Sequence, residues 1–229
     1  GYGLKIKTII LSAMLVSPTV FANTSANINV LGEIKPPTCL INGASQSDII
    51  FSLPMISPKF LLKSSSYDLS KLEKVKKEIT VICDAETYLT FKTSDAYAST
   101  GSSMSQYPYY FSLVSSKETE KSIGSILFSY TDIKVDSNKA YISAVLPSGN
   151  TNVMVLYKNA LTGWSKSEND LASNAELFKV LKSGKVFAFS INNEATYIDS
   201  IDRLTASGID LASEVNYQGE VVLTFNFGV

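Results

Sequence analysis

Apolar and polar residues alternate along most of this chain, and a period of two is typical of β-strands with one buried face. Segments rich in alternating or β-branched residues predict strands over residues 26–34, 78–83, 88–93, 109–114, 125–130, 139–146, 152–157, 185–192 and 219–229. Clusters of Ser, Asn, Gly and Pro, such as residues 99–103 and 147–150, separate them. Many short strands at this spacing indicate an all-β fold, and a β-sandwich in particular.

Two segments are candidates for helical structure. Residues 169–182 repeat apolar side chains at roughly helical spacing, which predicts a helix there. Residues 69–77 are rich in lysine and predict a short helical turn or an exposed loop. Their lysines offer a site for an acidic surface, but we interpret them as a solvated edge, because runs of charge usually are.

The N-terminus has the layout of a secretory signal. Lys5 and Lys7 precede an apolar stretch over residues 9–16, and Val20 and Ala22 occupy the −3 and −1 positions of a cleavage site. The apolar stretch is too short to span a bilayer, which needs about 20 residues. We therefore predict a signal peptide over residues 1–22, export of the mature chain, and no membrane span after the signal is removed.

Export bears on the two cysteines, Cys39 and Cys83. An even number of cysteines in an exported chain favours a disulfide, and only one pairing is possible within the chain. Two free thiols or a bond between chains are the alternatives. We predict the internal bond, which closes a loop of about 45 residues.

Composition and charge exclude several classes of function. The formal net charge of −1 offers no basic field for nucleic acid. Histidine is absent, which removes Ser-His and Cys-His catalysis and histidine-based metal sites, and we predict no metal and no cofactor. A carboxylate pair, such as Asp199 with Asp202 or Asp84 with Glu86, or a Ser-Lys dyad remains. Nothing in the sequence places such groups in a cleft, so we predict no enzymatic activity.

Aromatic residues present a further choice between packing and binding. Trp164 is the single tryptophan, and we expect it in the core or in a turn rather than in a ligand platform. The run Tyr107-Pro108-Tyr109-Tyr110 is suited to stacking on sugar rings, but a half-buried strand is the more common role of such a run.

The two ends of the predicted mature chain alternate most regularly. The N-terminal segment places Ala26, Ile28, Val30, Gly32 and Ile34 on one face. Pro36 and Pro37 then end the strand, because proline cannot donate to a β-ladder. The C-terminal segment places Val221, Leu223, Phe225, Phe227 and Val229 on one face.

These ends resemble the subunits of chaperone–usher fimbriae. In residues 30–39 a glycine, Gly32, stands seven positions before the first cysteine, and a proline pair stands close to it, as in that family. Cys83 and the terminal strand lie about where the family has them, and residues 123–136 and 197–219 most resemble a longer branch of fimbrial-like proteins of poorly defined role. The chain departs from the family at Gly228, where an aromatic residue is usual.

The resemblance implies an immunoglobulin-like sandwich that lacks its last strand. Residues 37–229 would form this domain, and residues 23–36 would form a donor strand. In the family, the open groove is first filled by a strand of a periplasmic chaperone and then, at the outer-membrane usher, by the donor strand of the neighbouring subunit.

The resemblance also assigns roles to individual residues. Ile28, Val30 and Ile34 would insert into a neighbour, with Gly32 where the groove is shallow. The receiving groove would be lined by Val221, Leu223, Phe225 and Phe227, and basic residues of the chaperone would bind the Val229 carboxylate. The predicted function is a structural subunit of a surface fimbria, reached through the periplasm. The alternatives are a secreted adhesin and a self-contained extracellular binding domain.

Overall fold

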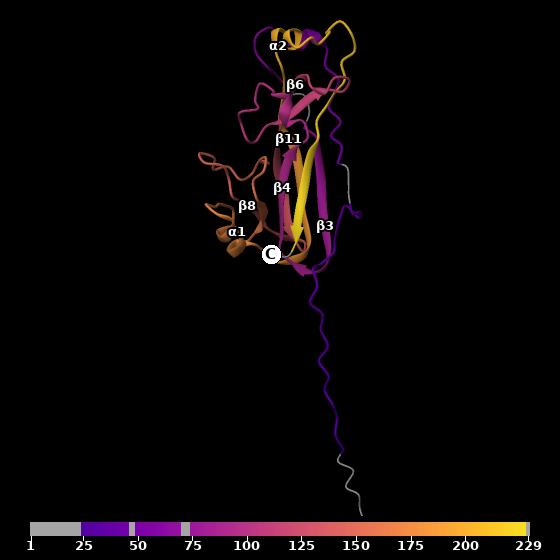
Figure 1. Ribbon diagram of the computed structural model, residues 1–229, viewed down its shortest axis with the longest axis vertical. Helices are drawn as coiled ribbons and strands as arrows, with labels where there is room; N and C mark the ends of the chain where they lie inside the picture. Colours follow the sequence, from indigo (N-terminus) through magenta and orange to yellow (C-terminus); the bar gives the residue numbers. More distant parts are fainter. Residues whose placement is uncertain (1–23, 46–48, 70–73, 228–229) are drawn as a thin grey trace, which may run out of the picture. The chain divides into compact units, whose positions relative to one another are not determined.

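The computed structural model describes residues 24–45, 49–69 and 74–227. The described residues from Lys35 onward belong to one compact unit, and those before Lys35 belong to a separate unit. The compact unit is mostly β-structure, in two sheets that enclose a common hydrophobic core (Figure 1). The predicted all-β sandwich is therefore confirmed, whereas the predicted signal peptide lies outside the described residues.

The first sheet is antiparallel in all its described pairings. Its strands, in spatial order, are β1 (Cys39–Ile41), β3 (Lys76–Thr87), β11 (Gly184–Ile198), β6 (Ser122–Val135), β5 (Phe111–Ser115) and β12 (Tyr217–Gln218). Beside this path, β2 (Tyr67–Asp68) pairs with β11, and β7 (Asn138–Lys139) pairs with β6. Antiparallel neighbours need no helical crossover, which suits a chain with so little helix.

The second sheet ends at the C-terminal strand. Its order is β10 (Asn169–Asp170), β8 (Tyr141–Ala144), β9 (Thr162–Ser165), β4 (Leu89–Asp95) and β13 (Val221–Phe227). Figure 1 shows β13, the yellow arrow, running beside β4. The chain thus finishes its described course on a sheet edge, while the long strands β3, β6 and β11 occupy the interior of the other sheet.

The helices are short. Those that the described residues form completely are α1 (Asn174–Val180), α2 (Ile201–Ala206) and the 3₁₀ turns η1 (Pro58–Phe60) and η3 (Ala98–Thr100). The helix predicted over residues 169–182 is confined to α1, because the Ser173 hydroxyl caps its first turn by accepting from the Glu176 N–H. The helix α2 has no counterpart in the prediction, since its six residues are too few to show a helical period.

Two predicted strands, over residues 26–34 and 152–157, do not form within the chain. Residues 152–157 do not form a strand, and a single bridge between Ser129 and Val155 joins them to β6. Asn159, at a φ of 60°, then turns the chain away before a longer ladder is built. Residues 153–158 are all buried or half-buried, so this apolar segment packs against the core as an irregular loop rather than as part of a ladder.

The main core is aromatic at its centre. Trp164 is fully buried and stacks on Phe189 at 5.0 Å between ring centroids, and its indole N–H donates to the Ala188 carbonyl at 3.0 Å. Phe91, on β4, lies 5.6 Å from both rings and joins the two sheets. The tryptophan therefore packs in the core, and its one polar group is satisfied there.

The tyrosine run is a turn before β5 and not a half-buried strand. Tyr107 stacks on Tyr109 at 5.6 Å between ring centroids, and Tyr109 contacts Tyr157 at the same distance. Tyr110 is buried and lies 5.9 Å from Tyr197 of β11. The rings thus pack mainly on one another, which fixes the loop against β11.

Alkaline pH should destabilise this cluster. Burial, with the neighbouring Tyr197, raises the pKa of Tyr110 from 10.0 to about 12. In the unfolded chain the hydroxyl ionises near pH 10, so between about pH 10 and pH 12 the unfolded chain binds fewer protons and the free energy of unfolding falls. Urea titrations across this range should show a smaller fall for Tyr110→Phe than for the parent. An equal fall in both proteins would contradict this role of Tyr110.

Candidate functional site

The edge of the second sheet at β13 is open. β13 pairs with β4 along its whole length, from Val221 opposite Asp95 to Phe227 opposite Leu89. On its other side it has no partner strand within residues 24–45, 49–69 and 74–227. Such an edge presents a row of backbone donors and acceptors to which another strand can pair.

The phase of the ladder decides which backbone groups face the open side. Directly before β13, the Ala96 N–H donates to the Glu220 carbonyl at 3.0 Å. Because hydrogen-bonded and non-hydrogen-bonded pairs alternate in an antiparallel ladder, every second residue from Val222 onward bonds to β4. The backbone groups of the odd-numbered residues from Val221 to Phe227 therefore face the open edge.

Side chains of the same residues point into the sandwich. Val221, Leu223 and Phe225 pack against the main core but remain only partly buried, while the residues between them are exposed. The ring of Phe225 lies 5.6 Å from that of Phe91, whose exposed fraction is 1%. Inward-facing side chains that stay partly exposed indicate that the core is not fully covered at this edge.

The opposite rim of this opening is the segment 49–53. Ile49, Phe51 and Leu53 pack against the main core, whereas Ile50 is 70% exposed. The Phe51 ring lies 5.1 Å from that of Phe128, yet the segment belongs to no strand. This rim was not predicted from the sequence, although the alternation of apolar residues before Pro54 is a local signal for it.

Between the two rims lies an apolar groove with a volume of about 850 Å³. Its floor is made of inner-face residues of the first sheet and one loop residue: Ile79, Val81, Phe111, Leu113, Ile126, Phe128, Ile191 and Leu156. Of the residues predicted to form a groove, Val221, Leu223, Phe225 and Phe227 line it. The fifth, Val229, lies outside the described residues.

A sharp passage between the sheets positions β13. The chain leaves β12 in the first sheet and enters β13 in the second through Gly219. A Cβ at Gly219 would lie 2.9 Å from the Ser112 carbonyl oxygen, so a side chain does not fit there. The Asp95 carboxylate supports the same corner by accepting from the backbone N–H groups of Ser112 and Tyr97 at 2.8 and 2.9 Å.

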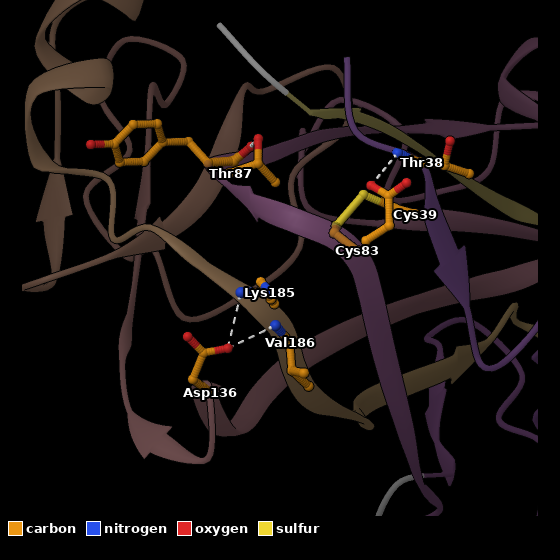
Figure 2. Close-up of a disulfide and its surroundings, with 9 residues drawn as sticks. Thr38, Cys39, Cys83, Thr87, Asp136, Lys185 and Val186 are labelled. Carbon is orange, nitrogen blue, oxygen red and sulfur yellow. Dashed lines mark hydrogen bonds between the residues drawn. A yellow bond between two sulfur atoms is a disulfide. The ribbon is translucent and has the colours of Figure 1, made fainter. Parts of the chain in front are cut away.

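The disulfide between Cys39 and Cys83 confirms the predicted internal pairing. It joins β1 to β3, where these two residues are cross-strand partners, and Figure 2 shows it beside Thr38. The Thr38 N–H donates to the Asp84 carboxylate at 2.9 Å, which adds a second link at the same point. Because Cys39 also lines the groove, the bond ties this part of the groove lining to β3.

A second anchor lies nearby in the same view. The Asp136 carboxylate accepts from the backbone N–H groups of Lys185 and Val186, both at 2.9 Å (Figure 2). These two bonds hold the pKa of Asp136 below its usual range. They secure β11 at its irregular start, where the register with β3 shifts between Gly184 and Val186.

Charged side chains are scarce in the groove, and several of its polar side chains lie near the start of β13. Among the described residues, Glu220 is the only charged residue in its lining. The Gln218 side-chain amide donates to the Tyr97 hydroxyl at 2.6 Å at this end. The Tyr217 hydroxyl is buried without a hydrogen-bond partner among the described residues, and burial raises its pKa.

The predicted donor residues belong to the separate N-terminal unit. The described part of this segment, from residue 24, forms no strand within the chain. Ile28 and Val30 are each 92% exposed, and Ile34 is exposed throughout. Gly32 has no atom within 4 Å of the position of a Cβ. Four alternate positions, each apolar or small, are thus exposed.

The carboxylates considered for catalysis are engaged elsewhere. Asp199 is 1% exposed and accepts from the hydroxyls of Ser103 and Ser122 at 2.8 and 2.9 Å, while Asp202 accepts from Ser64. Asp84 accepts from the Thr38 N–H, and Glu86 accepts from the Ser183 hydroxyl. None of these four carboxylates lines the groove. Within the described residues, no group of three or more His, Cys, Asp or Glu residues is placed to hold a metal ion.

Comparisons with known proteins add no relative: no protein-family model and no curated protein matches this sequence. In the part of the chain that the structure describes, no helix is long and apolar enough to cross a membrane. The groove at β13 is the most distinctive surface feature of the described residues.

Proposed function

We propose that this protein is a structural, non-catalytic subunit of a surface fimbria, joined to its neighbours by exchange of β-strands. The observation that carries the proposal is the open edge of β13, along which Val221, Leu223 and Phe225 face inward but stay partly exposed. The resemblance of both chain ends to chaperone–usher subunits supplies the class of protein.

In this proposal an extended strand from another chain adds to β13. Its backbone bonds to the odd-numbered residues from Val221 to Phe227, and its alternate side chains enter the groove. The N-terminal segment supplies such a strand, because Ile28, Val30 and Ile34 are exposed and alternate. Burying three aliphatic side chains contributes roughly 5–8 kcal/mol before the cost of ordering the strand.

The resemblance implies the order of partners. A periplasmic chaperone fills the groove first, and a neighbouring subunit replaces it at the outer-membrane usher. Because an open apolar edge favours aggregation, a chaperone strand that covers the edge would keep the subunit from aggregating before assembly. The Cys39–Cys83 bond is in keeping with an oxidising compartment such as the periplasm.

A peptide experiment tests the proposal. Residues 37–229, purified from an oxidising compartment, should be weakly stable or aggregate, because nothing fills the groove. A synthetic peptide of residues 23–36 should raise the melting temperature. At a free peptide concentration of 100 times the dissociation constant, the stabilisation is about 2.7 kcal/mol.

Matched peptides separate insertion from nonspecific binding. A peptide with Ile28, Val30 and Ile34 changed to Asp should fail, because it would bury charges. A peptide with three outward residues, Asn27, Asn29 and Leu31, changed to Asp should still stabilise the domain. If the truncated protein is stable alone and ignores every peptide, the sandwich is complete, and a self-contained extracellular binding domain becomes the better interpretation.

A further inference from the structure

We propose that Lys35 of one copy of this chain pairs with Glu220 of the next, and that this ion pair sets the register and direction of the inserted strand. The inference rests on the proposed function, because it requires residues 24–36 of a second copy to occupy the groove beside β13. It commits the groove to a particular partner, since the inserted strand must carry a cation at one defined position.

Glu220 is placed to select such a strand. It is the only charged residue among the described ones that line the groove, and it stands at the end where β13 begins. Its side chain is exposed, and it forms no ion pair with another described residue. Because Val221 faces inward, Glu220 faces the solvent side of the sheet, where an incoming strand can reach it.

One antiparallel register matches both apolar faces over their described length. It places Ile34 opposite Val221, Gly32 opposite Leu223, Val30 opposite Phe225 and Ile28 opposite Phe227. All four inward-facing residues of β13 then meet the inward-facing residues of the donor. The next pair in the same register is Lys35 opposite Glu220, with both side chains on the outer face.

The backbone phase brings this charge pair close. Glu220 uses its carbonyl to accept from Ala96 on the β4 side, so toward the groove it occupies a non-hydrogen-bonded position. In such pairs the Cα atoms are about 4.5 Å apart and the side chains are closest. Opposite charges placed directly across two strands stabilise the pairing.

Other registers of the inserted strand, and the parallel direction, fit β13 less well. A shift of two residues in one direction puts Glu33 opposite Glu220, which places like charges together. The opposite shift puts Pro36 opposite Val221, where a backbone N–H is needed and proline has none. A parallel strand that aligns Ile28 with Val221 puts the uncharged Asn27 opposite Glu220. Only the proposed arrangement pairs opposite charges.

A charge-exchange experiment on the full chain tests the inference. A fluorescent peptide of residues 24–36 and its Lys35→Glu variant are titrated with the parent protein and with Glu220→Lys. Each single reversal should weaken binding about threefold to tenfold, since an attraction becomes a repulsion. The two reversals together should restore affinity to within about twofold, and added salt should reduce all these differences.

Two control variants test whether the effect is specific to Lys35 and Glu220. A Glu33→Lys peptide and a Glu214→Lys protein reverse a charge away from the proposed pair, so neither should show the compensation. If the parent peptide binds but Lys35 and Glu220 do not compensate, the ion pair is wrong while strand insertion stands. If the charge reversal at Glu33, rather than the one at Lys35, is the change that Glu220→Lys compensates, the register is shifted by two residues. If no peptide binds, the proposed function fails and the inference fails with it.

Discussion

Replacing Phe91 with alanine should lower the free energy of unfolding by about 3–5 kcal/mol, the usual cost of removing a buried phenylalanine ring. Phe91 is 1% exposed and lies 5.6 Å from the rings of Trp164, Phe189 and Phe225. Removing it leaves a cavity between the two sheets, and it also takes support from a groove residue. Urea denaturation, followed by tryptophan fluorescence, measures the change.

Tyr88→Ala is the matched control for this variant. Tyr88 immediately precedes β4 but is 40% exposed, so its replacement should change the free energy of unfolding by no more than about 0.5 kcal/mol. A loss below about 1 kcal/mol for Phe91→Ala would contradict the central place of this ring in the core. A weakened binding of the residue 23–36 peptide at temperatures where the variant is still folded would show that Phe91 also shapes the groove through Phe225.

The second large effect is expected on removing the disulfide. The double variant Cys39→Ala/Cys83→Ala frees a loop closed over a sequence separation of 44 residues. In the chain-entropy model this lowers the free energy of unfolding by about 4 kcal/mol. The loss matters more in a sandwich with an open edge, because less apolar burial is available to offset it.

A reducing agent gives an independent check of the disulfide. It should lower the melting temperature of the parent protein and leave that of the double variant unchanged. A double variant as stable as the oxidised parent would show that the hydrogen bond from the Thr38 N–H to Asp84 and the β1–β3 pairing suffice alone.

The fold class could be predicted from the sequence because a period of two is a local property. The strand predicted over residues 185–192 is part of β11, and the one over residues 219–229 contains β13. Short elements were less predictable. The helix α2 is too short for a period, although its cap, Ser200, and the acid Asp202 in its first turn are local signals that mark it.

Only one rim of the groove could be predicted from the sequence. Phe225 and its alternating neighbours mark one rim, since they belong to a regular strand. The other rim, around Phe51, forms no strand, and the floor is assembled from β3, β5, β6 and β11, which are far apart in sequence. Local patterns do not encode such distant contacts, so the groove emerges only when the two sheets pack.

By itself, the sequence determined that this protein is built of strands, that Cys39 can pair only with Cys83 within the chain, and that both ends alternate. It did not distinguish the two ends, because an alternating segment has the same pattern inside and outside a sheet. Only the tertiary structure decided that β13 pairs with β4 on one side and has no partner strand among the described residues on the other. The physical reason is that strand partners are chosen by long-range backbone pairing and core packing, which depend on the whole folded sandwich.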